Sequence, residues 1–575
     1  MDLSISNGIG AGDNAETPML ENCVVNGAVD YKGLPAARAS SGGWRSAAFI
    51  IGAEIGERFA YYAISANLIT YLTGPLRQST AAAAAANVNA WGGVALVIPL
   101  LGAFVADSFL GRFRTIAFSS LLYVVGLGLL TLSAILSSLS GSDCQTNDIM
   151  SCSPSLFQVI LFFFALYLVA FAQGGHKPCI QAFGADQFDG EDPEECKAKS
   201  SFFNRLCFGI SMASLVTTTI VSYIQDNLSW ALGFGISSIS MVVALIIFLL
   251  GTTTYRFSIS HNEKVPFVRI GRVFVAAFWN SRRAPSFIAT EVEILHRQKS
   301  EQYNFLDKAL IAPCHLKEDD WVCSVAEVEE AKAVFRLVPI LGTCLIYGIF
   351  YAQPGTFFTK QGATMERTIV SGFKLPAASL QCFISIAMLT FIPIYDRVFV
   401  PFARAFTRKP SGITALQRIG AGIFLSVFTM VIAALVEIKR LNTAKEYNLV
   451  DKPDVSIPMS VWWLVPQYIL YGITVVLTMV GLQEFFYDQV PTELRSIGIA
   501  LYHCIFGVGS FLSSFLVTVI DNATGGSGRD SWFSNNLNRG HLDYFYWLLA
   551  GLSAVGFAAY FHFARSYIYN RRETM

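Results

Sequence analysis

Twelve stretches of the chain are mostly apolar and about 20 residues long, the length that an α-helix needs to cross the hydrocarbon core of a membrane. Within a bilayer only a helix or a closed barrel satisfies all backbone hydrogen bonds, and apolar stretches of this length favour helices. We therefore predict an all-α membrane protein with twelve transmembrane helices. The predicted spans are 46–73, 90–107, 115–137, 157–183, 202–224, 229–250, 335–357, 375–395, 412–436, 460–486, 496–520 and 542–566.

The low content of charged residues supports this prediction. Asp, Glu, Lys and Arg together make up 14% of the 575 residues, whereas soluble domains contain about 25%. The formal net charge is zero, so no nucleic-acid partner is expected, because proteins that bind nucleic acids are usually basic. Eleven cysteines occur without a Cys-x-x-Cys pair, so we expect no structural zinc site, no disulfide scaffold and no cofactor. The main expected partner is the lipid bilayer.

The spans form two sets of six, separated by the longest polar connection. We predict six-helix bundles over 46–250 and 335–566, joined by a cytosolic linker over 251–334. The linker contains eleven Lys or Arg residues interleaved with acids, which predicts a soluble segment with some amphipathic helix. Residues 1–45 are polar and rich in Gly, Ala and Ser, so we expect a disordered cytosolic tail without a signal peptide. Residues 567–575 are expected to form a second cytosolic tail.

Basic residues in the short connections predict which side of the membrane each connection faces. They follow spans two, four and eight, whereas the connection between spans three and four has none. Both termini are therefore expected in the cytosol. The connection at 437–458 opposes this pattern, because four basic residues lie on its predicted outer side: Lys439, Arg440, Lys445 and Lys452. The sequence leaves open whether the membrane is the plasma membrane or the vacuolar membrane.

Two six-helix halves joined by a cytosolic linker are typical of transporters that alternate access to a site near the middle of the membrane. Channels and receptors are also built from many helices, so the charges inside the membrane must separate these classes. An enzyme is not expected, because the chain has no metal-spaced His/Cys set, phosphate-binding glycine loop or Gly-x-Ser-x-Gly motif in a suitable context.

Span one carries three ionisable residues, Glu54, Glu57 and Arg58. A charge at the middle of a bilayer costs about 2.5–3.5 kcal/mol, so such residues usually face a cavity and have a function. Two carboxylates beside one guanidinium leave one acid whose charge depends on a proton or on another cation. Lys177 on span four is the expected cation, and protonation of the acids would break its salt bridge to them. The alternative is an ion network that only joins span one to span four.

Aromatic and histidine side chains near these charges have competing interpretations. Tyr61 and Tyr62 follow the acids and either line a cavity or pack against neighbouring helices. His176 lies beside Lys177 and two glycines, and a packing role is the favoured interpretation.

The junction after span two predicts a conformational role rather than a substrate contact. Asp107 is expected to cap the junction, Gly111 to permit a tight turn, and Arg112 to meet the membrane surface.

Several motifs together resemble the proton-coupled oligopeptide transporter family, and in particular its plant nitrate/peptide branch. The resemblance runs from about residue 30 to the end of the chain. It implies a major-facilitator fold and proton-driven symport of a small solute, with proton coupling by Glu54, Glu57 and Arg58 and with Lys177 as their partner. The motifs are Glu54-x-x-Glu57-Arg58-Phe59-x-Tyr61-Tyr62, Asn87-Val-Asn-x-Trp91, Gly102 to Arg112, Gly174-Gly175-x-Lys177-Pro178, Phe183-Gly-Ala-Asp-Gln-Phe188, Phe202-Phe203-Asn204, Phe305-Leu-Asp-Lys-Ala309 and Gln483-Glu-Phe-Phe-Tyr-Asp488.

Two departures from the family pattern bear on the solute. A nitrate-binding histidine of that branch falls on span seven, where this chain has Tyr351, so nitrate would lose a charge-assisted hydrogen bond. An acid on span ten of many members is replaced by Val475, which cannot pair with the amino terminus of a peptide. The resemblance therefore implies nitrate or a bulky neutral or weakly charged plant metabolite more than a di- or tripeptide.

Polar residues on spans seven and ten are further candidates for the cavity, although ordinary hydrogen bonding between helices is the alternative for each of them. Pro354 is expected to kink or unwind span seven and so to supply a hinge. Cys144 and Cys152 lie in an outward connection, and whether they pair is left open. The candidates are Tyr351, Gln353, Thr356, Gln467 and Thr474.

The sequence thus favours a proton-coupled symporter, expected as a monomer or weak dimer. A sensor or receptor on the same fold, which transports nothing, is the alternative from a different class. A di- or tripeptide symporter is a further alternative within the transporter class.

Overall fold

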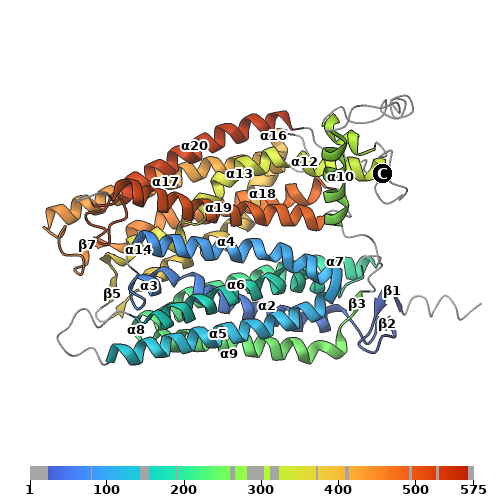
Figure 1. Ribbon diagram of the computed structural model, residues 1–575, viewed down its shortest axis with the longest axis horizontal. Coiled ribbons are helices and arrows are strands. Elements are labelled where there is room, and N and C mark those ends of the chain that lie inside the picture. Colours follow the sequence, from blue (N-terminus) through green and yellow to red (C-terminus); the bar gives the residue numbers. More distant parts are fainter. Residues whose placement is uncertain are drawn as a thin grey trace, which may run out of the picture.

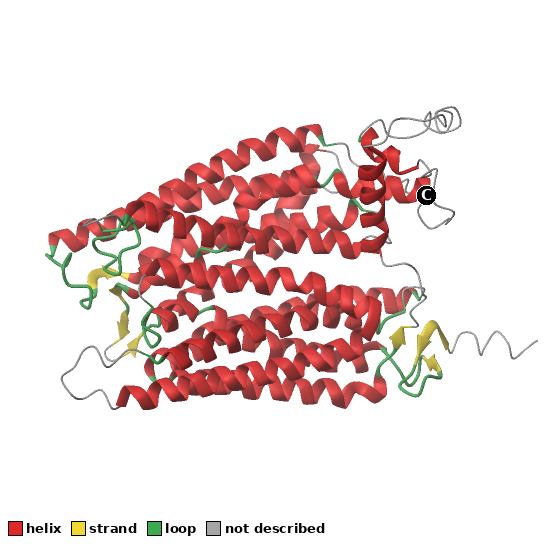
Figure 2. Ribbon diagram, in the orientation of Figure 1, coloured by secondary structure: helices red, strands yellow, loops and turns green. Residues whose placement is uncertain are grey.

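The computed structural model describes residues 24–78, 81–142, 154–189, 192–258, 266–281, 303–310, 323–370, 373–407, 413–490, 495–525 and 530–567. Long helices run side by side along its longest axis, with the N-terminal helices in one group and the C-terminal helices in another (Figure 1). The few strands lie beyond the ends of these helices (Figure 2). The mostly helical architecture predicted from the sequence is confirmed.

Eleven helices in the described ranges are long and apolar enough to cross a membrane, and they correspond to predicted spans two to twelve. Helix α2 (Gly43–Ser65), the first predicted span, falls outside this set, because each window of 18 residues within it contains Glu54, Glu57 and Arg58. It packs against α7 and α9 and lies parallel to the other helices (Figure 1). The charges that exclude α2 from this set are those expected to carry function.

The N-terminal half is built around α6, which packs against α4 and α5, while α9 packs against α2 and α5. A capping box formed by Ser155 and Gln158 begins α6, because each side chain bonds the backbone N–H of the other residue. The helices of this half are α2 (Gly43–Ser65), α3 (Leu68–Thr73), α4 (Ala81–Val105), α5 (Arg112–Ser142), α6 (Leu156–Ala185), α7 (Pro193–Val216), α8 (Ser222–Asn227) and α9 (Trp230–Leu250), with π-helical turns at Ala106–Leu110 and Thr217–Val221.

The C-terminal half has α17 packed between α18 and α20, and α13 packed between α19 and α20. Its helices are α13 (Val338–Tyr351), α14 (Thr359–Ala363), α15 (Cys382–Ile394), α16 (Val400–Thr407), α17 (Ala415–Glu446), α18 (Val465–Asp488), α19 (Arg495–Thr524) and α20 (Leu542–Ser566), with π-helical turns at Pro354–Phe358 and Tyr395–Phe399. The small strands are β4 (Met365–Glu366), which pairs in parallel with β7 (Ile457–Ser460), and β5 (Thr368–Val370), which pairs with β6 (Phe373–Lys374).

The first span of each half is interrupted near the same end. In the N-terminal half, α2 stops at Ser65 and α3 resumes at Leu68. In the C-terminal half, α13 stops at Tyr351 and a π-helical turn begins at Pro354. Pro354 has no backbone N–H to donate to the preceding turn, so the predicted break in span seven is confirmed.

Hydrogen bonds join the two halves at the end of the molecule where these breaks lie, which we call the sealed end. Gln381 donates through Nε2 to the Ala66 carbonyl (2.9 Å), and Lys360 donates through Nζ to Thr73 Oγ1 (2.6 Å). Further hydrogen bonds at this end link the start of α4 to α19 and the end of α7 to α15: Asn89 to Ser513, Ser514 to the Ala86 carbonyl, and Ser214 to Ser385. In Figure 1 this end carries α3, α14 and β5, whereas β1, β2 and α10 lie at the other end.

Residues 24–45 are folded, so the prediction of a disordered tail over 1–45 is wrong for this part, and residues 1–23 lie outside the described ranges. Strand β1 (Val24–Val29) pairs antiparallel with β2 (Pro35–Ala37) and with β3 (Phe257–Ser258), which follows α9. Composition alone could not predict this sheet, because β3, one partner of β1, comes from the other end of the N-terminal half. The sheet ties the start of the chain to the start of the linker.

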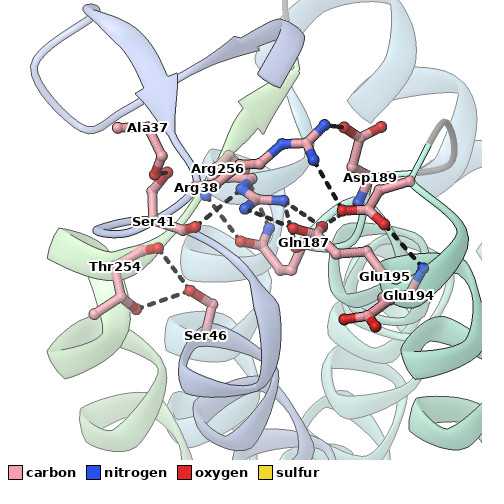
Figure 3. Close-up of polar contacts among 11 residues, drawn as sticks. Ala37, Arg38, Ser41, Ser46, Gln187, Asp189, Glu194, Glu195, Thr254 and Arg256 are labelled. Atoms are coloured by element: carbon pink, nitrogen blue, oxygen red, sulfur yellow. Dashed lines mark hydrogen bonds and ion pairs between the residues drawn. The ribbon is translucent and has the colours of Figure 1, made fainter. Parts of the chain in front are cut away.

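A buried arginine fastens this sheet to the helices (Figure 3). The Arg256 side chain is 2% exposed; it donates to Glu195 Oε2 at 2.7 Å and to the Ser41 carbonyl at 3.0 Å. Arg38 adds ion pairs to Asp189 and Asp192 at 2.6 and 2.8 Å. Gly42 is required beside this cluster, because its φ is +77° and a Cβ there would clash with the Arg256 side chain.

We expect Arg256→Leu to lower the stability of the protein measurably. Loss of the guanidinium removes the cation beside Glu195 and the donor to the buried Ser41 carbonyl, and an unsatisfied buried group costs about 1–3 kcal/mol. The check is the melting temperature of detergent-purified protein, with Arg539→Leu as the matched control, because the Arg539–Asp451 pair is solvent-exposed. Equal melting temperatures for the Arg256 and Arg539 variants would contradict the prediction.

The linker contains helix, as predicted. Helices α10 (Pro266–Ser281) and α12 (Val325–Phe335) are joined by ion pairs of 2.9 Å from Arg269 to Glu330 and 2.7 Å from Arg272 to Glu327. A 3₁₀ helix at Asn304–Leu310 packs against both α10 and α12. The two ends of the linker therefore lie side by side.

A second buried ion pair explains part of the basic segment at 437–458. Glu437 and Arg440 on α17 are 0% exposed, and Arg440 Nε donates to Glu437 Oε2 at 2.8 Å. Arg440 also donates to Asn538 Oδ1 at 2.7 Å and to the Leu537 carbonyl at 2.9 Å. Because its charge is neutralised inside the bundle, Arg440 does not count as a cation of the outer connection.

Candidate functional site

The three charges of α2 form a buried cluster in the middle of the helix. Glu54 and Glu57 are 0% exposed and Arg58 is 5% exposed. Arg58 Nε lies 2.6 Å from Glu57 Oε2 and 3.3 Å from Glu54 Oε1, and Gln181 of α6 donates to Glu54 Oε1 at 3.3 Å. One guanidinium therefore serves both carboxylates, as the sequence predicted.

Small residues on the opposite face of α2 fix the direction of these charges. A Cβ on Gly56 would meet Ala244 and the Ser240 carbonyl of α9, and Ser240 Oγ donates to the Gly56 carbonyl at 3.2 Å. Because this face of α2 is packed tightly on α9, Glu54 and Arg58 are turned toward α6.

Lys177 lies near the cluster without forming the predicted salt bridge. It is half-buried on α6 and close enough to interact electrostatically with Glu54, Glu57 and Arg58. Among the described residues, however, the ion pairs of Glu54 and Glu57 within 4.0 Å are to Arg58 and His176, not to Lys177. Arg58 occupies the carboxylates because it lies on the same helix. The direct ion pair is therefore a wrong prediction for this conformation, whereas the proximity is as expected.

Tyrosines from both halves lie beside the cluster. The Tyr61 ring stacks on Trp91 at 5.6 Å and meets Tyr62 edge-on at 5.5 Å, and the Arg58 guanidinium lies 5.5 Å from the Tyr61 ring centroid. Tyr351 of α13 lies close enough to Tyr61 and Tyr62 to interact with them electrostatically. Tyr351 is thus the second-half candidate that faces the first half.

Gln353 and Thr356 serve the break in span seven. Gln353 donates to the Ile349 carbonyl at 2.8 Å, and Thr356 Oγ1 donates to the Ala352 and Gln353 carbonyls at 3.2 Å each. Both side chains are 0% exposed. Their hydrogen bonds compensate the backbone groups that the interruption leaves unpaired. Of the two roles considered for Gln353 and Thr356, hydrogen bonding within the helix therefore fits the structure better than contact with a substrate.

The candidates on α18 are also buried within the C-terminal half. Gln467 donates to Gln361 Oε1 at 3.3 Å, and Gln361 donates to Glu437 Oε2 at 2.8 Å, so Gln467 belongs to the Glu437–Arg440 network. Thr474 donates to the Leu470 carbonyl of its own helix. Val475 is 3% exposed and packs in the apolar core.

The junction after span two has the predicted turn. Gly111 has a φ of +76° and follows the π-helical turn at Ala106–Leu110. Arg112 forms an ion pair with Asp186 at the end of α6, and its side chain is 35% exposed. Its contact with the membrane surface stays a prediction. The side chain of Asp107 lies outside the described part of the chain, as do Cys144 and Cys152.

Two ionisable groups were underrated or missed by sequence reasoning. His176 is 1% exposed, and its Nδ1 lies 4.0 Å from Glu54 Oε2. His503 of α19 is half-buried in the other half and close enough to Lys177 and Arg58 to interact electrostatically with them. A histidine within an apolar span was the available signal for His503.

Comparison with known proteins agrees with this architecture. The sequence model that describes the POT family matches residues 113–533 of this chain. Among curated proteins, "Protein NRT1/ PTR FAMILY 5.10" of Arabidopsis thaliana is 62% identical over the full length of both chains, and "Protein NRT1/ PTR FAMILY 5.12" of the same plant is 55% identical over 97% of this chain and 99% of its own.

Solved structures give the same fold at low identity. A crystal structure of an auto-inhibited POT family peptide transporter covers 92% of this chain and 99% of its own, with a TM-score of 0.69 and 21% identity. The POT family transporter PepTSo covers 91% of this chain and 98% of its own, with a TM-score of 0.66 and 21% identity. The major-facilitator type of fold expected from the sequence is confirmed.

Proposed function

The chain belongs to the POT family of transporters and is of the NRT1/PTR type, and on that premise we propose that it is a proton-coupled symporter of a small solute. The observation that carries the proposal is the buried cluster of Glu54, Glu57 and Arg58 beside Lys177. Charges buried at this depth are costly, and a role in moving a proton is the reason to retain them.

The charge balance of the cluster supports coupling between a proton and a solute. Two carboxylates balance Arg58 and Lys177 when both acids are ionised. A proton on the pair of acids would remove one negative charge and leave Lys177 free to attract the solute or to change its position. Release of that proton on the other side would restore the attraction, which makes each transport step depend on the proton.

The bonds at the sealed end support alternating access. They hold the halves together where spans one and seven are interrupted, through Gln381, Lys360 and Ser385. Opening that end requires these bonds to break while the halves approach at the other end. With basic residues and the linker placed in the cytosol, the sealed end would face away from it. The plasma membrane and the vacuolar membrane both remain compatible with this orientation.

The walls of the site favour a small anionic or neutral solute such as nitrate or a plant metabolite. Tyr61, Tyr62 and Tyr351 supply aromatic surface, and Lys177 supplies a positive charge. Val475 offers no carboxylate to an amino terminus, so nothing at that position supports a dipeptide. The protein is expected to work as a monomer or weak dimer in the bilayer.

The test is accumulation of solutes in oocytes at an external pH of about 5.5 and of about 7.5. The panel contains nitrate, dialanine and a set of plant hormones and their conjugates, and surface biotinylation confirms that the protein reaches the plasma membrane. Acid-stimulated uptake of one compound would establish symport and its solute.

We expect Glu57→Gln to lose at least about tenfold of acid-driven accumulation, because an amide permanently removes one of the two negative charges whose balance with Arg58 and Lys177 the coupling proton changes. Exchange of labelled for unlabelled solute needs no net proton movement and should persist. The matched control is Glu446→Gln, an exposed acid at the end of α17. Absence of all uptake by protein at the surface would instead favour a sensor that transports nothing.

A further inference from the structure

An imidazole nitrogen, His176 Nδ1, faces the proton-coupling cluster without a hydrogen-bond partner among the described residues. Within the described ranges, no hydrogen bond reaches His176 Nδ1 or Glu54 Oε2, and both side chains are about 99% buried. The two atoms lie 4.0 Å apart. Buried polar atoms are nearly always paired, so two unpaired atoms facing each other require an explanation.

The packing of α6 leaves His176 no other direction. A Cβ on Gly174 would collide with Ile98 of α4, and one on Gly175 would collide with Ser119 of α5. Successive residues of a helix are rotated by about 100°, so the next side chain, His176, is turned to the remaining neighbour, α2. The glycines thus position the imidazole against Glu54 rather than merely making room for it.

At 4.0 Å, the distance between His176 Nδ1 and Glu54 Oε2 is too long for a hydrogen bond but short enough for the two atoms to interact electrostatically. A hydrogen bond to oxygen needs about 2.7–3.2 Å between the heavy atoms. A proton placed on either partner makes one atom a donor and the other an acceptor, and closing the contact then needs a movement of about 1 Å. Without that proton, the carboxylate and an unprotonated Nδ1 repel each other.

We propose that His176 shares the coupling proton with Glu54, so that the proton is held between His176 Nδ1 and Glu54 Oε2. This inference rests on the proposed symport and adds a group to its proton site. Proton uptake would draw α2 toward α6 at this level, and proton release would let them separate. His176 would therefore connect the charge of the cluster to the distance between two helices of the N-terminal half.

The other charged and titratable groups around His176 are known from every helix packed against α6. Helix α2 contributes Glu54, Glu57 and Arg58, together with Tyr61 and Tyr62, which interact with Arg58 and Glu57. Helix α5 contributes Tyr123, which interacts with Glu57. Helix α4 has no titratable residue between Ala81 and Val105. Lys177 follows on α6 itself, and it interacts with the same acids. His176 Nδ1 and Tyr123 Oη both lack a hydrogen-bond partner among the described residues; Tyr123 interacts with Glu57, whereas His176 faces Glu54.

The test compares His176→Asn with the wild type over a range of external pH, using the solute panel above with nitrate first. Asparagine keeps a polar atom near the position of Nδ1 but cannot titrate. We expect the ratio of uptake at about pH 5.5 to uptake at about pH 7.5 to fall threefold to tenfold, equivalent to a shift of about half to one pH unit. Solute exchange should be retained. His562→Gln, at an exposed histidine of α20, is the matched control.

A second readout needs no solute and covers variants that fail to transport. Infrared difference spectra of the purified protein follow the carbonyl stretch of a protonated buried carboxyl, which Glu54→Gln assigns. The midpoint of this band should move in His176→Asn, or in His176→Gln if the first variant does not fold. An acid-stimulated wild type together with an unchanged pH profile and an unchanged band would overturn the role of His176 alone. A wild type without acid stimulation would overturn the symport proposal and this inference together.

Discussion

Transport is expected to stop when the sealed end is covalently closed. Ser214 Oγ of α7 and Ser385 Oγ of α15 lie 3.2 Å apart, are buried, and belong to opposite halves. A disulfide has an S–S bond of about 2.0 Å, so small side-chain rotations would allow the Ser214→Cys/Ser385→Cys variant to form one. Because alternating access requires the halves to part here, we expect uptake to fall by more than about tenfold under oxidising conditions.

The measurement is solute uptake with and without a membrane-permeant reductant, together with mass spectrometry of the cross-linked peptide. Each single cysteine variant controls for the loss of one hydroxyl and for disulfides with native cysteines. Reductant should restore uptake in the double variant and leave the single variants unchanged. Undiminished uptake by protein whose disulfide has been verified would contradict the view that this contact must break.

The largest loss of stability is expected from Arg440→Leu. Glu437 would remain as an unpaired carboxylate at 0% exposure, and the carbonyl of Leu537 and the Oδ1 of Asn538 would lose their donor. Breaking a buried ion pair by removing one partner costs about 3–5 kcal/mol. We therefore expect a strong drop in the melting temperature of the purified protein and in the amount of protein that reaches the membrane.

Two companions separate the ion pair from other effects. Lys445→Gln removes an exposed cation from the same helix and should leave the melting temperature unchanged. Glu437→Gln/Arg440→Leu removes both charges and should regain part of the loss, because no carboxylate is left uncompensated. If the double variant is no more stable than Arg440→Leu, the loss comes from packing rather than from the unpaired charge.

Most of the helical architecture was predictable because the bilayer imposes it. In lipid, an apolar stretch of about 20 residues forms an α-helix because the helix satisfies all its backbone hydrogen bonds. The eleven candidate spans agree with the sequence prediction. The interruptions of spans one and seven were harder to predict from the sequence. Pro354 predicted the one in span seven, whereas Ala66 and Asn67 gave no such signal for the interruption after α2. Tertiary contacts such as the bond from Gln381 to the Ala66 carbonyl accompany that interruption.

The site was predictable where residues on a single helix determine the contacts. Glu54, Glu57 and Arg58 interact because their spacing places them together. Contacts between helices depend on rotation and depth, which composition does not reveal. Gln467 accordingly lies in the Glu437–Arg440 network rather than in the cavity, and Lys177 is near the acids without pairing with them. The assignment of His176 to the site required the structure, in which the packing of the two preceding glycines directs its side chain toward α2.

The ion pairs between α10 and α12 determine how the length of the linker affects the two halves. Arg269–Glu330 and Arg272–Glu327 hold the two ends of the linker side by side, so the chain between these helices is a closed loop rather than a tether whose length sets the spacing of the halves. For a flexible loop, closure costs only about 0.6 kcal/mol for each doubling of length. Insertions and deletions between α10 and Asn304 would therefore be nearly neutral for transport, whereas Asn304–Leu310 is constrained by its packing against both helices.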